Sequence, residues 1–170
     1  MVVAEGARIR LRHAKPDDAP FFLRLMNAPG WIRYIGDRQI RTDEDARAYI
    51  QNSLISSYET RGFGLYVVEH AEQTQPIGLC GLLQRDYLKA PDLGFAILPE
   101  YERQGFTREA IDLTLAHATQ TLKVPEVLAI VLEENQPSRN LLIRCGFTPS
   151  GTVTSDTGNE LLLYRQTLAG

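Results

Sequence analysis

Two periodicities meet between residues 92 and 122. A short apolar run from Leu93 to Leu98 is typical of a strand. After a turn that contains Gly105, apolar residues recur at the spacing of one helix face, which predicts an amphipathic helix from about 104 to 122. A second apolar run, Val127 to Leu132, then predicts a buried central strand. This alternation of strand and helix points to a mixed α/β fold.

The remaining segments carry comparable signals. Strict alternation from Arg8 to Arg12 puts Ile9 and Leu11 on one face and three arginines on the other, which predicts a half-exposed strand. The other predicted elements are a helix from Pro16 to before Pro29, a loop or short irregular helix over 29–41, a helix over 42–57, strands over 65–68, 77–83, 147–153 and 161–166, and a helix capped by Asn135 and ended by Gly146. In chain order the elements are βααβββαβαββ.

Length and composition narrow the class of protein. At 170 residues the chain is near the usual size of one domain, so we expect a single domain over residues 1–170. Its 44% hydrophobic and 23% charged residues exclude a mainly disordered chain. The formal charge of −3 gives no reason to expect a nucleic acid partner. Apolar runs fall far short of the roughly 18 residues of a membrane span, and the first residues lack a secretory signal, so we expect a cytoplasmic protein without a membrane partner.

Several kinds of catalytic centre are excluded by inspection. The chain holds no Walker or Rossmann glycine motif, no G-x-S-x-G and no H-E-x-x-H. Cys80 and Cys145 lie in apolar segments without a second ligand at metal spacing, so we expect two buried, reduced thiols and no metal. His13, His70 and His117 are isolated and are expected to be structural or surface residues.

The turn between the strand ending at Leu98 and the long helix is suited to an anion. Consecutive backbone N–H groups and the positive end of a helix dipole converge there, which favours a phosphate-bearing ligand. Gly105 lets the backbone approach closely, and Arg103 and Arg108 can add positive charge. A tight turn without a ligand is the alternative, because a glycine between a strand and a helix often serves the turn alone.

Two motifs about 30 residues apart carry a resemblance to a known family. Glu-Arg-Gln-Gly-Phe-Thr at 102–107 opens the long helix, and Asn-Gln-Pro-Ser at 135–138 is followed by Cys-Gly-Phe at 145–147. With the order of elements, these residues resemble the GNAT acetyltransferase superfamily, and within it the ribosomal-protein alanine N-acetyltransferase group. The resemblance covers nearly the whole chain. It implies a mostly antiparallel central sheet with helices on both faces, and direct transfer of acetyl from acetyl-CoA to an amine.

The resemblance also implies where acetyl-CoA binds. The backbone that would hold its pyrophosphate is that of Arg103, Gln104, Gly105, Phe106, Thr107 and Arg108. The pantetheine arm would pair with the preceding strand at Ile97 and Leu98, like an added strand. Asn135 would bond this arm, and Ser138 would lie near the thiol. Both are also good helix-capping and first-turn residues, which is the structural alternative.

Four positions depart from the family pattern. Glu102 stands where Gln or Arg is usual, and Thr107 stands where Gly or Ala is usual. A carboxylate that faced a pyrophosphate would repel it, so we expect Glu102 to point outward. Leu142 and Ile130 occupy positions where many relatives carry a Tyr acid and a Glu base. The usual acid–base pair is therefore absent.

The missing base favours one class of acceptor. An α-amino group has a pKa of roughly 7.7 to 8.0, so about a tenth of it is already neutral and nucleophilic near pH 7. A lysine side chain, with a pKa of about 10.4, is neutral only in about one molecule in a few thousand. We therefore expect a protein or peptide N-terminus, or a small amine of low pKa, as the acceptor.

Catalysis would then rest on positioning and on polarisation of the thioester carbonyl by a backbone N–H at the Leu98 end of the strand. Asp92, at the start of that strand, is the candidate to take the amine proton through water. Asp156 and Glu160 compete for that role, and each of the three carboxylates has a plain structural alternative. Ser138 is the candidate to protonate the departing thiolate.

The resemblance implies that three aromatic residues, Trp31, Tyr34 and Tyr87, lie in loops beside the acceptor groove. Aromatic rings there would bind a peptide terminus. Core packing is the equal alternative for Trp31. Two other functions stay open: a non-catalytic acyl-CoA binding or regulatory module, because the Tyr and Glu are missing, and a nucleotide binder that uses the same turn. A homodimer is left open as well.

Overall fold

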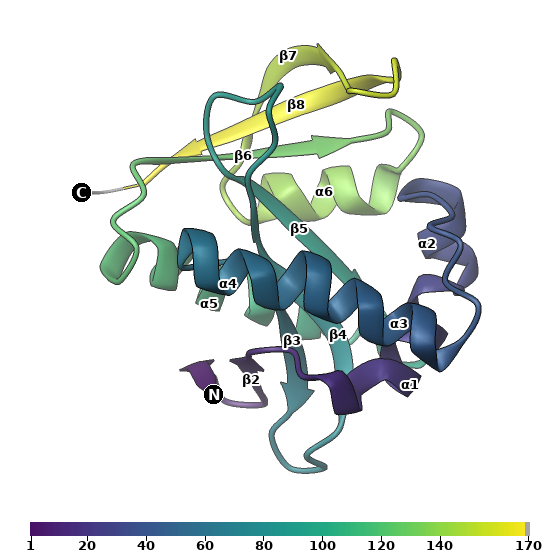
Figure 1. The fold of residues 1–170 in the computed structure, drawn as a ribbon. Helices are drawn as coiled ribbons and strands as arrows, with labels where there is room; N and C mark the ends of the chain where they lie inside the picture. Colours follow the sequence, from purple (N-terminus) through teal and green to yellow (C-terminus); the bar gives the residue numbers. More distant parts are fainter. Residues whose placement is uncertain (169–170) are drawn as a thin grey trace.

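A computed structural model describes residues 1–168 of the chain, and its centre is one sheet of eight strands (Figure 1). Their bounds are β1 Val2–Glu5, β2 Ile9–Arg12, β3 Leu65–His70, β4 Pro76–Leu83, β5 Asp92–Ile97, β6 Glu126–Val131, β7 Thr148–Thr154 and β8 Glu160–Thr167. The order across the sheet is β1-β2-β3-β4-β5-β6-β8-β7. Neighbouring strands are antiparallel except β5 and β6, which are parallel. The expected mixed, mostly antiparallel sheet is confirmed.

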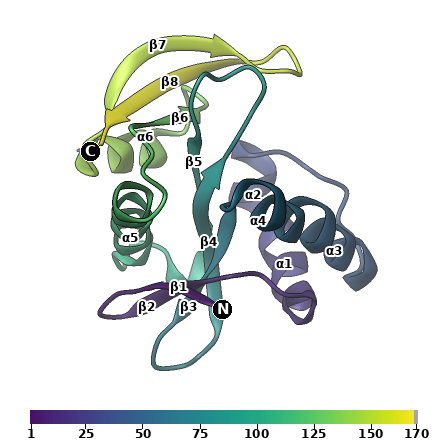
Figure 2. The same cartoon turned by 60° about the vertical axis from the view of Figure 1, so that its left-hand side comes forward.

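Helices cover both faces of this sheet, as expected (Figure 2). One face carries α1 Ala19–Met26, α2 Pro29–Tyr34, α3 Asp43–Tyr49, the π-helical segment Ile50–Ile55 and α4 Ser56–Arg61, and the other carries α5 Phe106–Gln120 and α6 Gln136–Arg144. Alternation along the strands divides the core between the two faces. In β3, Val67 packs with the residues of α1 and α3, whereas Tyr66 and Val68 pack with those of α5.

The predicted elements are present, with differences that have local causes. The helix expected over 42–57 continues to Arg61 and changes to π-helical pitch at Ile50–Ile55. Its start is capped as the sequence indicated, because the Thr42 side chain accepts a hydrogen bond from the Asp45 amide. Strand β1 was not predicted, since four residues carry too little pattern, and it exists by pairing with β2. Segment 29–41 contains the short helix α2.

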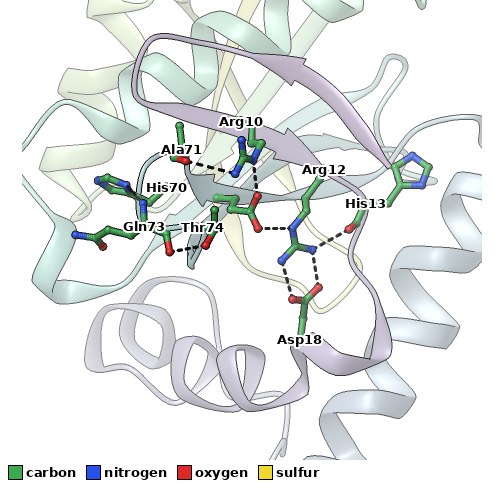
Figure 3. Close-up of polar contacts among 9 residues, drawn as sticks. Arg10, Arg12, His13, Asp18, His70, Ala71, Gln73 and Thr74 are labelled. Atoms are coloured by element: carbon green, nitrogen blue, oxygen red, sulfur yellow. Dashed lines mark hydrogen bonds and ion pairs between the residues drawn. The ribbon is translucent and has the colours of Figure 1, made fainter.

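Strand β2 shows how the arginine-rich face is used. Ile9 and Leu11 have no exposed surface, as the alternation predicted. Arg12 is nevertheless only 9% exposed, because it forms ion pairs with Glu69 of β3 and with Asp18, just before α1 (Figure 3). The expectation of a solvent-exposed arginine is therefore wrong at position 12. The guanidinium instead connects β2 and β3 to the turn that precedes α1.

The cysteines and histidines have structural surroundings. Cys80 and Cys145 are buried and free, and the Cys80 sulfur lies 3.2 Å from the Thr114 hydroxyl. His13 stacks on Tyr58, and burial lowers its pKa. Nδ1 of His70 accepts the Gln73 amide within the β3–β4 turn.

Among residues 1–168 there is no group of three or more His, Cys, Asp or Glu side chains placed to hold a metal ion. Within the same residues, no helix has the length and apolar character to cross a bilayer.

Candidate active site

The central sheet is incompletely paired between β5 and β6. The ladder joining them consists of one pair, Asp92 with Leu128, and of the hydrogen bond from the Leu128 amide to the Pro91 carbonyl. Beyond Asp92, β5 pairs with β4 alone. Its residues 94–97 are half-buried, although β5 lies in the middle of the sheet. We call the side of Gly94–Ile97 that faces β6 the open edge of β5.

Hydrogen bonding to β4 fixes which backbone groups reach the open edge. The Leu98 amide donates to the Ile77 carbonyl at 2.9 Å, and the Leu98 carbonyl accepts from Tyr101. Backbone groups alternate in direction along an antiparallel ladder, so those of Phe95 and Ile97 point away from β4. The expectation of a free amide at Leu98 is therefore wrong. At this end of the strand the amides of Ile97 and Phe95 face the open edge.

The loop after β5 presents a row of backbone N–H groups. Within the described part of the chain, none of the amides from Arg103 to Arg108 donates a hydrogen bond. Arg103 has φ 61° and Gly105 has φ 84°, so both lie in the left-handed region, where glycine is favoured. Helix α5 begins at Phe106 and adds the positive end of its dipole. The arrangement suits an anion such as a phosphate.

The side chains of this loop take separate directions. Glu102 and Arg103 are exposed, as expected for Glu102, and Thr107 is half-buried. Arg108 reaches across to α6, where its Nη2 donates to the Arg144 carbonyl at 3.2 Å. The Arg108 charge therefore stabilises the C-terminal end of α6.

The start of α6 lies at the same end of the sheet as this loop, because β5 and β6 are parallel and both are followed directly by these segments. Oδ1 of Asn135 accepts the Ser138 amide at 3.4 Å and caps the helix. Both residues are half-buried. Leu142, on the same helix, is 1% exposed and belongs to the core.

Asp92 occupies the paired end of β5 and is covered by Arg85. Its carboxylate is 1% exposed and accepts the Arg85 Nε at 3.1 and 3.2 Å. Burial raises the pKa of Asp92 to about 6, and Arg85 opposes that rise. The rise per residue of a strand puts Asp92 about 10 Å from Phe95 and about 16 Å from Ile97. The carboxylate is therefore buried. It does not face a groove, which is contrary to the role expected for it from the sequence.

The other predicted residues are spread around this centre. Asp156 and Glu160 are exposed in the β7–β8 hairpin. Trp31 is 6% exposed and belongs to the core beneath α1–α4, which decides between its two interpretations. Tyr34 is half-buried beneath Arg33, and Tyr87 is half-buried in the β4–β5 loop. Sequence reasoning missed Arg85, which no motif marks but which precedes Asp92 by seven residues in a short hairpin.

Comparison with known proteins gives concordant findings. Residues 8–148 match the family model described as an acetyltransferase (GNAT) domain. The uncharacterized N-acetyltransferase YoaA of Bacillus subtilis (strain 168) is 27% identical over 153 residues, which cover 89% of this chain and 85% of that protein.

Solved structures share the fold at low identity. A RimL ribosomal L7/L12 alpha-N-protein acetyltransferase in complex with coenzyme A has a TM-score of 0.75 and 16% identity, with 99% of this chain and 98% of that chain covered. A spermidine N-acetyltransferase SpeG chimera from Vibrio cholerae and hSSAT has a TM-score of 0.77 and 20% identity, with 95% and 96% covered.

Proposed function

Because the chain belongs to the GNAT acetyltransferase family, we propose that it transfers an acetyl group directly from acetyl-CoA to the α-amino group of a protein or peptide N-terminus. N-acetyl transfer is the activity of the family, and its members use acetyl-CoA. This favours an enzyme over the non-catalytic acyl-CoA module and the nucleotide binder. The single observation that carries the proposal is the open edge of β5 leading into a loop of unpartnered amides. We further propose that residues 1–170 form one catalytic domain.

The residues present fit acetyl-CoA. The amides of 103–108 and the N-terminus of α5 would hold the pyrophosphate, and the open edge of β5 would pair with the pantetheine arm at Ile97. The Nδ2 group of Asn135, which donates no hydrogen bond within residues 1–168, would bond the same arm from the side of α6. Acetyl-CoA supplies an acetyl group activated as a thioester. Amides of Phe95 or Ile97 would donate to the thioester carbonyl oxygen, where negative charge develops.

Proton handling in this proposal needs little from the protein. An α-amine of pKa roughly 7.7 to 8.0 is partly neutral at pH 7, so a strong base is not required. Asp92 would accept the amine proton only through a chain of water molecules, because its carboxylate is buried behind Arg85 and lies about 10 Å along the strand from Phe95. Ser138 would donate a proton to the departing thiolate, whose pKa of roughly 8.5 makes it a good leaving group.

The acceptor class is supported by the chain's own residues. A lysine side chain is almost fully protonated at pH 7 and needs a base to become nucleophilic. Ile130 and Leu142 supply neither a carboxylate nor a phenol for that purpose. Tyr34 and Tyr87 are half-buried aromatic residues that would contact the acceptor. The names of the structural neighbours include both an alpha-N-protein and a spermidine acetyltransferase, so a polyamine is the competitor to test.

The test is an acceptor panel. The purified chain is incubated with acetyl-CoA and with N-terminal peptides, an N-blocked peptide containing lysine, or spermidine, and released CoA thiol is measured. Only an enzyme releases CoA in proportion to the acceptor. Turnover on unblocked peptides supports the proposal, preference for spermidine or for the blocked peptide overturns the acceptor class, and binding of CoA without turnover on any amine overturns the activity.

A further inference from the structure

Arg8 directs its side chain to the start of α5. Its Nη1 donates to the carbonyl oxygen of Gln104 at 2.8 Å, and its Nε donates to Glu109 Oε1 at 2.9 Å. The guanidinium carbon lies 4.4 Å from the centroid of the Phe106 ring. One side chain thus contacts the loop after β5, the first residue of α5 and the first turn of that helix.

The bond to Gln104 determines where the next amide points. The peptide bond between Gln104 and Gly105 is trans, so its N–H points opposite to its C=O. The carbonyl points at Arg8, and the Gly105 N–H therefore points to the far side of the loop. This amide donates to no group among residues 1–168. It is oriented and available for a ligand.

The contact with Glu109 removes a charge conflict. Glu109 lies in the first turn of α5, where a free carboxylate would repel an anion bound at the helix start. Its oxygens accept hydrogen bonds from the Arg8 side chain and from the amides of Arg8 and Ile9. Burial opposes ionisation of Glu109, but these bonds hold its pKa below the usual range. The negative charge is thus neutralised on the side of the loop away from the Gly105 amide.

Stability does not account for this arrangement. The Arg8 side chain is 45% exposed, and ion pairs at such sites contribute little to the free energy of unfolding. A second pair is closely matched: Arg165 is 44% exposed and bonds Glu126, which is 18% exposed, whereas the Glu109 of the first pair is 19% exposed. Arg165 lies on β8 and has no hydrogen bond to the loop.

We propose that Arg8 is a positioning residue for acetyl-CoA binding, which holds the peptide between Gln104 and Gly105 so that the Gly105 amide faces the pyrophosphate. This inference rests on the proposed function, since it takes residues 103–108 as the pyrophosphate site. It assigns to Arg8 an action through the backbone and no contact with the ligand.

Arg8→Met tests the inference, because methionine keeps an unbranched stem over Phe106 and removes every donor. Binding of CoA is measured by calorimetry, with Arg165→Met as the matched control. We expect Kd for CoA to rise about tenfold in Arg8→Met and to stay at the wild-type value in Arg165→Met. Arg8→Lys, which keeps one donor group, should fall between wild type and Arg8→Met. Thermal midpoints of the two methionine variants should agree.

A backbone readout separates positioning from general loosening. In ¹⁵N spectra, addition of CoA should shift the Gly105 amide strongly in the wild type and weakly in Arg8→Met. Equal CoA affinity in wild type and Arg8→Met overturns the inference, as does a loss of affinity that Arg165→Met shares or that parallels a fall in thermal midpoint. If the wild type itself does not bind CoA, the proposed function fails and the inference fails with it. Equal CoA affinity in wild type and Arg8→Met overturns only the inference about Arg8 and leaves the proposed function unaffected.

Discussion

The carboxylate of Asp92 is subject to two opposing influences. Burial to 1% exposure disfavours its charge, and the Arg85 guanidinium at 3.1 Å favours it. Burial dominates, so the pKa of Asp92 is raised to about 6. A carboxyl group with that pKa is mostly ionised at pH 7 and is closer to the operating pH than an ordinary aspartate. The pKa suits a general base, and the distance of about 10 Å along the strand to Phe95 means that the proton would reach Asp92 through several water molecules.

Substitution Asp92→Asn should therefore lower kcat by about 10² to 10⁴ at neutral pH, the range for loss of a general base, with CoA affinity unchanged. Ionised Asp92 increases as pH rises through about 6, so the wild-type rate should rise across that region. The variant should lack this limb. Its deficit should shrink above pH 8, where the amine is already neutral. A pH profile of kcat from 5 to 9 provides the measurement.

Two exposed carboxylates serve as comparisons. Asp156→Asn and Glu160→Gln alter groups of the β7–β8 hairpin that have no ion-pair partner within residues 1–168. If either loses activity while Asp92→Asn is near wild type, the base lies in the hairpin. Mild effects in all three variants would mean that positioning alone carries the rate.

At the scale of elements, the segment joining β5 to α5 depends on its left-handed residues. A side chain at Gly105 (φ 84°) would be strained by roughly 1–2 kcal/mol, and its Cβ would lie 3.1 Å from Arg8 Nη2. Gly158 has φ 86° in the β7–β8 hairpin, and a Cβ there would meet nothing within 4 Å. The two glycines share the backbone strain and differ in surroundings.

We expect Gly105→Trp to abolish CoA binding, because the indole would displace Arg8 and, with the strain at a left-handed residue, would distort the row of amides at 103–108. Gly158→Trp carries the same backbone strain and should bind CoA normally. Calorimetric titration with CoA and circular dichroism of both variants make the comparison. Wild-type affinity in a folded Gly105→Trp protein would remove the pyrophosphate site from this loop.

A second element-level feature is the connection of β2 to α1 by Arg12. Its guanidinium forms two hydrogen bonds with Asp18, at 2.8 and 2.9 Å, and a third with Glu69 at 3.0 Å (Figure 3). Asp18 is 5% exposed and also accepts the Lys15 amide, which begins the turn into α1. Removal of one partner would leave a buried charge partly uncompensated.

Asp18→Ala should accordingly reduce the free energy of unfolding by about 3 kcal/mol, the lower end for a broken buried pair, because Glu69 still binds Arg12. Arg24→Ala breaks an ion pair with Glu100 whose partners are 61% and 48% exposed, and its effect should be small. Urea titrations of both variants measure the difference. Equal effects of the two substitutions would show that burial of the ion pair between Arg12 and Asp18 adds nothing to the free energy of unfolding.

Across the whole molecule, the two helical layers approach the sheet from opposite faces, and the unpaired stretch between β5 and β6 lies between them (Figure 2). The loop of amides and the N-terminus of α6 belong to the α5–α6 side. Asp92 belongs to the opposite face, because Leu93 packs in the α5 core and neighbouring strand residues alternate. In the proposed function, the acceptor would therefore approach from the side of α1–α4.

This arrangement predicts a characteristic pH dependence of acceptor choice. Peptide N-termini should react faster than free lysine side chains at pH 7, because the neutral fraction of an α-amine exceeds that of a lysine side chain by more than two decades. The gap should narrow as pH rises toward 10. Competition between an unblocked peptide and an N-blocked lysine peptide, followed by mass spectrometry, measures the ratio. Preference for lysine at neutral pH would reveal a strong base and contradict the proposal.

Local sequence patterns determined most of the elements, since periodicity and capping depend on neighbouring residues. The helix that starts near Gly105, the Thr42 cap and the alternation of Ile9 and Leu11 all follow from side chains within a few positions. Motif order was enough to indicate the family. The proposed phosphate loop was also identifiable, because its N–H groups and glycine are consecutive in the chain.

Contacts between distant segments were decided only by the tertiary structure. Alternation assigned Arg8 and Arg12 to a solvent-facing side, yet Arg8 precedes the regular strand and bonds α5 about a hundred residues away, while Arg12 is buried against Asp18. The direction of the Leu98 amide depends on the register of β4, and the burial of Asp92 depends on Arg85. Register, strand separation and ion pairing are set by packing over the whole sheet, which no local pattern encodes.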